Sequence, residues 1–406
     1  MTTPFNYIFG FRATPLKFGV GATELLGKEA KKLGVKNALI IADNLVYEKT
    51  DVIKRAIESL EKEEIKYDIW KELKGEPTEE DVDKALDYVK GKDFDGFIGI
   101  GGGSAIDLTK IVDACYTHKP QSFKDYLAKP YGKGEPIPGP IKPLIAIPTT
   151  SGTGSETTRA AVIIVENAKA TAYDDFIAPK LAIVDPLNTI TMSPKVTAGT
   201  GIDAFTHALE AYLAKPTHLI PPGSIVTGSN LLVDIVSEKA IELIGKSLRV
   251  ATWDGKNLDA RSDMALAAYL AGIAFDSAGL HVIHSIGQAI GAIKGISHGI
   301  SVGLFAPAFL EVVAPICPEK VAKVAELLGK RTRGLDKIEA AMLASEAVRE
   351  LLRDIGFPNG LSEFDIKEND ISKFVEESVR RPRINSPIAI TPELAKNIIT
   401  KSIKIW

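Results

Sequence analysis

This sequence contains few cysteines and glutamines, and neither positive nor negative charge is in large excess. Its 2 cysteines in 406 residues are too few for a disulfide framework or a thiolate zinc site, which favours a reducing, cytoplasmic location. Lys and Arg total 49 against 52 Asp and Glu, a net charge of −3, and no run of five or more basic residues occurs. Nucleic acid is therefore not an expected partner.

Export and membrane signals are also missing from the sequence. The N-terminal stretch MTTPFNYIFGFRATP lacks the basic-then-apolar order of a signal peptide. No stretch of about 18 apolar residues is present for a membrane span. Only two glutamines, Gln121 and Gln288, occur among many Lys and Glu residues, a composition typical of hyperthermophile proteins. We expect a protein that does not bind membranes and that comes from a thermophile.

The hydrophobic pattern predicts two kinds of domain. Residues 1–190 alternate short β-type runs with amphipathic helical segments, the pattern of a Rossmann-like, doubly wound and mostly parallel sheet. The expected strands are 37–42, 65–70, 95–100, 143–148, 161–165 and 181–184. Residues 191–406 show helical periodicity only, with expected helices at 203–214, 231–245, 260–275, 277–294, 319–328, 338–355 and 392–403. We predict an α/β domain followed by an all-α domain.

Two loops at strand ends carry candidate binding groups. GGGS at 101–104 leads from a strand into a helical stretch, where backbone amides can hold a diphosphate. It matches neither G-x-G-x-x-G nor the P-loop pattern, and a tight turn would need the same glycines. PTTSGTGSE at 148–156 also follows a strand and supplies several hydroxyl groups. Because both loops end strands, we expect them to meet at a dinucleotide site.

Asp43 ends the strand 37–42. A carboxylate in this position can accept hydrogen bonds from the ribose of NAD and repel the 2′-phosphate of NADP. The same residue could instead cap the helix that follows.

Histidine is scarce, and most of it falls into one pattern. Of 6 histidines, His281, His284 and His298 lie in one short window, and Asp203 and His207 are four residues apart in a helical stretch. A pair at i and i+4 shares one helix face, which fits either a metal or a simple ion pair. One carboxylate and three imidazoles suit Fe²⁺, Zn²⁺, Co²⁺ or Mn²⁺.

Four motifs in order carry a resemblance to a known family. The sequence resembles the iron-containing (group III) alcohol dehydrogenases from about residue 12 to about residue 330 through GIGGGSAID, PLIAIPTTSGTGSE, GIDAFTHALEAY and AFDSAGLHVIHSIGQAIGAIKGISHG. The stretch from PYGKGEPIPG to TTSGTGSETT is most similar to the hydroxyacid–oxoacid transhydrogenase branch.

The resemblance implies both an architecture and a site. The architecture is that of dehydroquinate synthase, with a dinucleotide-binding domain at 1–190 and a helical metal-binding and substrate domain at 191–406. The implied metal, Fe²⁺ or alternatively Zn²⁺, is held by Asp203, His207, His284 and His298. The implied contacts of the dinucleotide, NAD in preference to NADP, are Asp43, Gly102, Gly103, Ser104, Thr149, Thr150 and Thr153.

Two positions depart from the family pattern. Gln288 stands where many members have a histidine assigned to proton transfer, and an amide cannot relay a proton by titrating. Thr171, with Lys169 nearby, stands where a lysine often lies near the ribose. We therefore assign the proton relay to His281, although a histidine of the cavity wall would fit the sequence equally.

The expected function is a metal-dependent oxidoreductase that transfers hydride between an alcohol or hydroxy acid and a nicotinamide cofactor, forming an aldehyde or ketone. A transhydrogenase is the alternative; it needs a cation for the substrate carboxylate, for which Arg159 and the pair Arg380 and Arg381 are candidates. A lyase of the dehydroquinate synthase type and a non-catalytic metal and nucleotide binding protein are further alternatives. We expect a cytoplasmic homo-oligomer, such as a dimer, acting on a small molecule.

Overall fold

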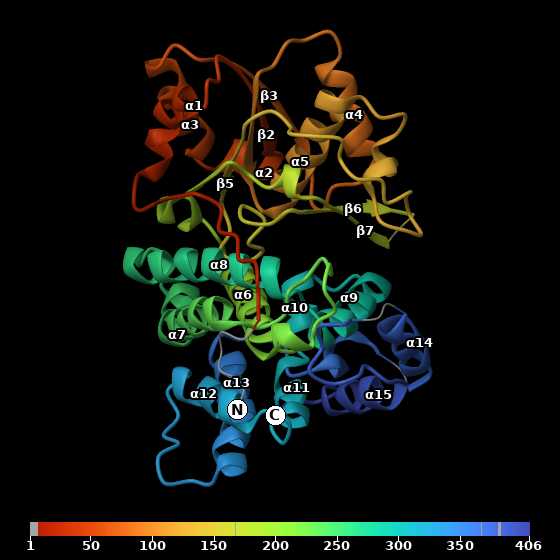
Figure 1. Ribbon diagram of the computed structural model, residues 1–406. Coiled ribbons are helices and arrows are strands. Elements are labelled where there is room, and N and C mark those ends of the chain that lie inside the picture. Colours follow the sequence, from red (N-terminus) through yellow and green to blue (C-terminus); the bar gives the residue numbers. More distant parts are fainter. Residues whose placement is uncertain (1–6, 167, 367, 381–382) are drawn as a thin grey trace. The chain divides into compact units, whose positions relative to one another are not determined.

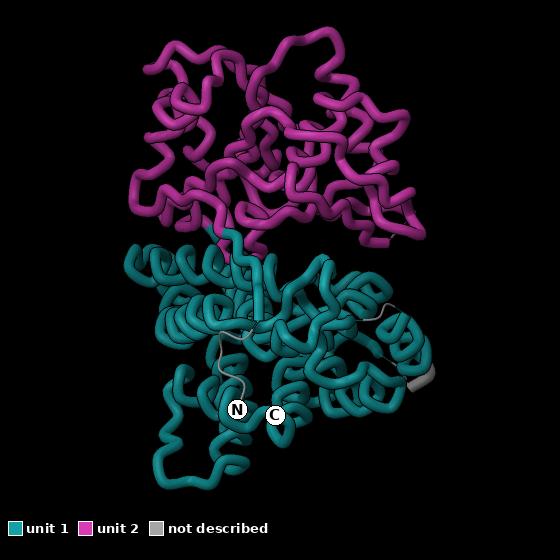
Figure 2. Tube along the Cα trace, viewed as in Figure 1, with its two compact units in different colours: residues 1–12, 192–406 teal, residues 13–191 magenta. Residues whose placement is uncertain are grey.

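The computed structural model describes residues 7–166, 168–366, 368–380 and 383–406. Contacts divide this part of the chain into two units (Figure 2). The α/β unit spans Ala13–Thr191, and the helical unit comprises Met192–Trp406 together with residues 7–12. The domain boundary near residue 190 stays a prediction, and the packing adds that the first described residues belong with the helical unit.

The α/β unit is built on a six-stranded sheet whose neighbouring strands all pair in parallel (Figure 1). In spatial order the strands are β1 (Leu16–Phe18), β8 (Leu181–Val184), β5 (Leu144–Pro148), β4 (Gly96–Gly101), β2 (Asn37–Asp43) and β3 (Lys66–Leu73). This confirms the predicted parallel sheet. The sequence pattern missed β1, which is only 3 residues long.

Both faces of this sheet are covered, which explains the continuous apolar runs of its strands. In β2, Leu39 and Ile41 belong to the core under α4 (Glu79–Val89) and α5 (Gly103–His118). Ile40 points the other way, into the core formed with α1 (Leu26–Lys32) and α3 (Val52–Lys62). The alternation of neighbouring residues between two cores is that of a doubly wound sheet.

One predicted strand lies outside the sheet. Residues 161–165 fall in β6 (Ala160–Val165), which pairs antiparallel with β7 (Ala168–Tyr173) in a separate two-stranded sheet. A parallel partner would require a crossover of a dozen residues or more, whereas only two residues separate these two strands in the sequence. The alternating burial of β6 also fits a sheet that is covered on one face.

The helical unit contains α6 (Pro194–Leu213), α7 (Leu231–Trp253), α8 (Leu258–Ala278), α9 (Val282–Lys294), α10 (His298–Gly303), α11 (Ala306–Val313), α12 (Pro318–Leu327), α13 (Lys337–Asp354), α14 (Glu368–Val379) and α15 (Pro392–Lys401). The sequence pattern missed α10, α11 and α14. One apolar core joins most of these helices, with Phe205, Phe305 and Phe309 fully buried. Within the described ranges no single helix is long and apolar enough to span a membrane, and α8 and α9 reach that length only as a pair bent by 105°.

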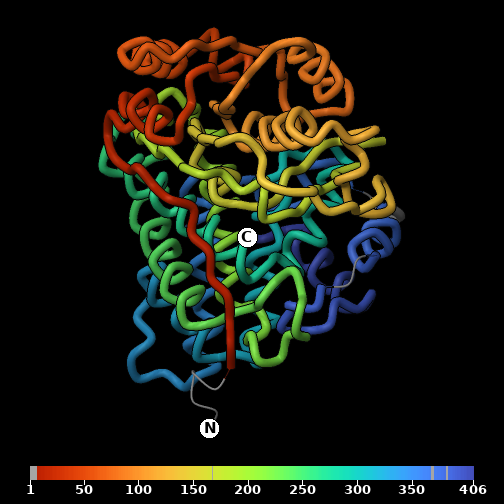
Figure 3. The backbone as a smooth tube through the Cα atoms, turned by 45° about the horizontal axis from the view of Figure 1, so that its top comes forward, coloured from red at the N-terminus to blue at the C-terminus, as the bar shows by residue number. Residues whose placement is uncertain are grey.

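The first described residues are tied to the helical unit by specific contacts. Arg12 forms an ion pair of 3.0 Å with Asp276, whose side chain is 1% exposed, on α8. The ring of Tyr7 lies 5.5 Å from that of His218. Figure 3 shows this segment in red, running along its own unit before the chain enters the α/β unit.

Candidate functional site

The four predicted metal ligands come together inside the helical unit. One donor atom from each of Asp203, His207, His284 and His298 lies within 4.8 Å of the others. The Nε2 atoms of His298, His207 and His284 are 3.4, 3.7 and 3.9 Å from Oδ1 of Asp203. Ligand atoms about 2.1 Å from a tetrahedral ion are separated by about 3.4 Å. The cluster therefore has the dimensions of a metal centre.

Local structure explains how residues far apart in sequence reach this cluster. Asp203 and His207 lie one turn apart on α6. Gly295, with φ of 66°, caps α9 in the left-handed region and ends it, so that the chain can turn back and begin α10 at His298. A Cβ on Gly299 would lie 2.7 Å from the carbonyl carbon of Gly199 on α6. Only glycine at 299 permits the close approach that sets His298 beside Asp203.

The chemistry of the donors fits a divalent metal. Three of the four side chains are buried, and His298 is 24% exposed. The imidazole of His207 stacks on Phe275 at 4.3 Å and on His284 at 4.8 Å between ring centroids, which fixes its plane. Nε2 of His284 is buried and has no hydrogen-bond partner among the described residues. An unpaired buried nitrogen that faces a carboxylate and two other imidazoles is accounted for by a bound cation.

Glu210 is the residue at this centre that the sequence analysis missed. It lies on α6, fully buried, and its carboxylate accepts hydrogen bonds from Nδ1 of His284 and, at 2.7 Å, from the backbone N–H of Ile283. Burial alone would raise the pKa of Glu210, but the attraction of His281 and His284 and their hydrogen bonds hold it well below its usual range. A signal was available, since Glu210 is seven residues after Asp203 and so lies on the same face of the helix.

His281 lies just before α9 and is fully buried. Its Nε2 is 2.9 Å from the main-chain oxygen of Glu210, and its Nδ1 is 3.2 Å from the carboxylate of the same residue. The contact with the main-chain oxygen satisfies Nε2, whereas Nδ1, although close to the carboxylate, has no hydrogen-bond partner among the described residues. The relay predicted for His281 stays a prediction.

The predicted dinucleotide residues lie at one edge of the sheet in the α/β unit. Strands β5, β4 and β2 are neighbours, so the loops after Pro148 and Gly101 and the side chain of Asp43 follow the carboxyl ends of adjacent strands. The helix α5 begins at Gly103 after an N-cap, Gly102, that makes no side-chain cap hydrogen bond. The backbone N–H groups at the start of this helix suit a diphosphate.

The loops after β4 and β5 touch each other. A Cβ on Gly103 would lie 2.8 Å from Oγ1 of Thr153, so only glycine fits between α5 and the threonine. The backbone N–H of Thr149 donates to the carbonyl of Gly101 at 2.9 Å. The structure thus brings Gly102, Gly103, Ser104, Thr149, Thr150 and Thr153 to the same edge of the sheet.

Asp43 has a structural task as well. Its Oδ1 accepts hydrogen bonds from the backbone N–H groups of Leu45 at 2.8 Å and Val46 at 3.3 Å, and so caps α2 (Asn44–Lys49). Its Cβ would be 3.4 Å from a Cβ on Gly101, which places Asp43 beside the glycine loop. Capping and ribose binding are compatible, because a carboxylate has two oxygens.

A buried lysine holds the hydroxyl-rich loop. Nζ of Lys110 on α5 donates to the hydroxyls of Ser155 at 3.1 Å and Thr158 at 3.0 Å and to the carbonyl of Ala160 at 2.7 Å. Ser155 also donates to Asp107, one turn before the lysine. These bonds tie the end of the loop to the helix that begins at the glycines.

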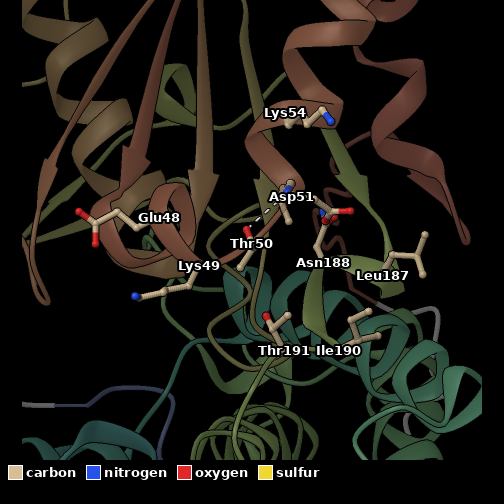
Figure 4. A pocket seen from close by; sticks show the side chains of 10 residues that line it. Glu48, Lys49, Thr50, Asp51, Lys54, Leu187, Asn188, Ile190 and Thr191 are labelled. Carbon is tan, nitrogen blue, oxygen red and sulfur yellow. Dashed lines mark hydrogen bonds between the residues drawn. The ribbon is translucent and has the colours of Figure 1, made fainter.

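A surface cavity of about 520 Å³ in the same unit lies elsewhere (Figure 4). It is lined by Glu48, Lys49, Thr50, Asp51, Val52, Lys54, Leu187, Asn188, Ile190 and Thr191, at the ends of α2 and α3 and around the turn after β8. None of these residues is a predicted site residue.

Three arginines were predicted as candidates to bind the carboxylate of a substrate. Arg159 lies in the α/β unit, paired with Asp175 at 2.7 Å. Arg380 is 59% exposed and pairs with Glu377, and Arg381 lies outside the described residues. Arg383, which the sequence analysis did not single out, donates from Nε to the hydroxyl of Ser285 at 3.1 Å. Ser285 follows His284, so Arg383 reaches the helix that carries a candidate ligand.

Comparison with known proteins identifies the family. Residues 13–186 match the sequence profile described as "Iron-containing alcohol dehydrogenase". Residues 197–403 match "Fe-containing alcohol dehydrogenase family, C-terminal". The chain belongs to the iron-containing alcohol dehydrogenase family. It is thus an enzyme of a family that uses iron and a nicotinamide cofactor, as the motifs indicated.

Individual relatives of this iron-containing alcohol dehydrogenase family member cover nearly its whole length. A mitochondrial hydroxyacid-oxoacid transhydrogenase from Bos taurus is 34% identical, over 99% of this chain and 91% of its own. The crystal structure of a 1,3-propanediol oxidoreductase is 28% identical with a TM-score of 0.89, over 98% of this chain and 100% of that one. Sulfoacetaldehyde reductase from Bifidobacterium kashiwanohense in complex with NAD⁺ is 25% identical with a TM-score of 0.84, over 98% and 99%.

The comparisons contradict the predicted cytoplasmic location. The relatives from Bos taurus, Xenopus tropicalis and Homo sapiens are all named as mitochondrial proteins. A low cysteine count shows only that the fold needs no disulfides, and this is true of proteins in any reducing compartment. Amino-acid composition therefore does not distinguish one reducing compartment from another.

Proposed function

We propose that this family member transfers hydride between an alcohol or hydroxy acid and a nicotinamide cofactor, with NAD preferred. The observation that carries the proposal is the convergence of Asp203, His207, His284 and His298, with an unpaired buried nitrogen at its centre. This donor set suits a divalent ion of the Fe²⁺ or Zn²⁺ type, and a substrate oxygen would bind as a fifth ligand.

The proposed roles follow from the contacts of each unit. When bound, the metal supplies Lewis acidity toward an alcohol or carbonyl oxygen, and the nicotinamide accepts or gives the hydride. Asp203 and the three histidines would hold the metal. The backbone at Gly102 and Gly103 would bind the diphosphate at the start of α5, and Ser104, Thr149, Thr150 and Thr153 would add hydroxyl groups.

The preference for NAD rests on Asp43. Its second carboxylate oxygen would accept hydrogen bonds from ribose hydroxyls, while its charge would repel a 2′-phosphate at the same place. The lysine typical of some family members is replaced by Thr171 on β7, and the nearby Lys169 is paired with Glu76.

A transhydrogenase is the second candidate, favoured by the Bos taurus relative that is 34% identical. Such an enzyme handles carboxylate substrates on both half-reactions and needs a cation to bind them. Arg383 is the best-placed arginine, because its bond to Ser285 sets it against α9 next to His284. A planar guanidinium also matches a carboxylate in two-point geometry.

One experiment tests the function and separates the two candidates. The protein is loaded anaerobically with Fe²⁺ or Zn²⁺ and assayed with alcohols and hydroxy acids, with NAD or NADP added. A dehydrogenase forms free NADH in proportion to product. A transhydrogenase instead converts a hydroxy acid only when an oxo acid is present, without added cofactor. If the metal-loaded protein catalyses neither reaction with any substrate of the panel, hydride transfer is refuted as the function.

The matched variant for the carboxylate site is Arg383→Met, which keeps an unbranched, flexible stem and removes the guanidinium and its charge. It should raise KM for hydroxy acids by about tenfold or more and leave KM for uncharged alcohols within twofold. Arg380→Met is the control, since Arg380 contacts Glu377 at the surface. Equal changes for charged and uncharged substrates would remove Arg383 from the substrate site.

A further inference from the structure

Two of the four candidate ligands and one other acidic residue share a face of α6. Asp203, His207 and Glu210 are spaced at i, i+4 and i+7, so all three point to the same side of the helix. Asp203 and His207 face the other donor atoms of the cluster. Glu210 is equally buried but supplies no donor atom to it.

The carboxylate of Glu210 is surrounded by donors from the beginning of α9. Its Oε1 accepts from the backbone N–H of Ile283 at 2.7 Å and of His281 at 3.2 Å. Its Oε2 accepts from Nδ1 of His284 and, at 3.4 Å, from the backbone N–H of that residue. The N-cap of α9, His281, makes no side-chain cap bond of its own. A carboxylate from α6 therefore accepts the hydrogen bonds of the N–H groups at the start of α9, where the helix dipole favours negative charge.

The bond to His284 decides which ring nitrogen carries the proton. An ionised carboxylate can only accept, so Nδ1 of His284 must donate and the neutral ring has its lone pair on Nε2. Nε2 is the nitrogen that faces Asp203 and has no hydrogen-bond partner among the described residues. A ring held with its lone pair already on the metal side binds a cation without first changing tautomer or orientation.

We infer that Glu210 is the positioning residue of the metal centre: it fixes His284 with an unprotonated Nε2 toward the other three ligands and anchors the start of α9 to α6. The inference rests on the proposed metal site and adds a residue that does not touch the metal. An amide cannot replace the carboxylate, because each oxygen accepts from at least one N–H group, so an NH₂ on either side would face a donor.

The test is the affinity of the purified full-length protein for Zn²⁺, measured by competition with a chelating dye. Glu210→Gln should bind Zn²⁺ about 10- to 100-fold more weakly than the unmodified protein. Glu311→Gln is the matched control, because it removes a largely buried carboxylate of the same unit that pairs with Arg349 and Lys401; its Zn²⁺ affinity should stay within twofold. Folded Glu210→Gln with unchanged affinity would overturn the inference.

A second measurement needs no variant. In the Zn²⁺-loaded protein, ¹⁵N NMR of the histidine side chains should show Zn²⁺ bound to Nε2 of His284 and the ring proton on Nδ1, whereas Zn²⁺ bound to Nδ1 would overturn the inference even if Glu210→Gln does not fold. Failure of this inference can be distinguished from failure of the proposed function. If the unmodified protein binds no Zn²⁺, the proposed metal site is refuted. If the unmodified protein and Glu210→Gln bind Zn²⁺ with the same affinity, only the role of Glu210 is refuted.

Discussion

The contact between Gly299 and Gly199 allows a quantitative test of the metal centre. A methyl group at 299 would be closest to the carbonyl oxygen of Gly199, and it would lie 2.7 Å from the carbonyl carbon of that residue and 3.3 Å from Cβ of Asp203. Ordinary contact begins at about 3.4 Å, so Gly299→Ala must move α10 away from α6 by at least 3.4 − 2.7, or about 0.7 Å. Metal coordination tolerates deviations of about 0.2 Å. We expect His298 to be lost as a ligand.

Two measurements check this expectation. Gly299→Ala should reduce Zn²⁺ affinity to about the level of His298→Ala, and overpacking should lower the free energy of unfolding by about 1–3 kcal/mol. Gly199→Ala is the control on the opposite side of the same contact, because its Cβ would meet only Ile300 at 3.8 Å; a helical Gly to Ala change there should be neutral or stabilising. If Gly299→Ala binds Zn²⁺ as tightly as the unmodified protein, the close approach does not position His298.

Three further predictions concern single side chains. His284→Ala should lower metal content and activity together, while His118→Ala, whose ring contacts the carbonyl of Gly139 in the α/β unit, should keep both; elemental analysis distinguishes them, and a fully active metal-free His284→Ala protein would contradict the site. Asp43→Ser should reduce the ratio of kcat/KM for NAD to that for NADP, and an unchanged ratio would limit Asp43 to capping α2. Burial raises the pKa of Glu156 from 4.5 to about 7, so the folded state keeps a proton that the unfolded chain releases. The resulting contribution to the free energy of unfolding is fully present below about pH 4.5 and is lost as the pH rises through 7. Glu156→Gln should remove up to roughly 3 kcal/mol of that decline, measured by urea unfolding at pH 5 and 7.5, and parallel pH profiles of the two proteins would refute it.

The sequence was sufficient where a feature depends on local pattern. The i, i+4 spacing of Asp203 and His207 needs only a helix, and the apolar runs of β2, β4 and β5 predict a buried parallel sheet. A capping box formed by Thr78 and Asp81, three residues apart, begins α4. Each of these follows from residues less than ten positions apart.

The rest depended on packing between segments that are far apart in sequence. The role of Gly299 is visible only when α10 is placed against Gly199, a hundred residues earlier. The partners of Glu210 come from α9, so the sequence shows that this acid shares a helix face with Asp203 but does not show what it binds. The short α10 was missed because 6 residues give too few turns for a hydrophobic period to be recognised.

The ion pair of Arg12 with Asp276 has a consequence for how the chain is made on the ribosome. The two residues are 264 positions apart, and the α/β unit lies between them in the sequence. At about 5–20 residues per second, roughly 13–50 seconds separate their synthesis. The α/β unit, complete at Thr191, can fold during this interval, whereas the segment 7–12 must wait for α8 before it finds its partner. Co-translational folding of this protein can thus start with the α/β unit, although the segment before that unit finds its partner only after α8 has been made.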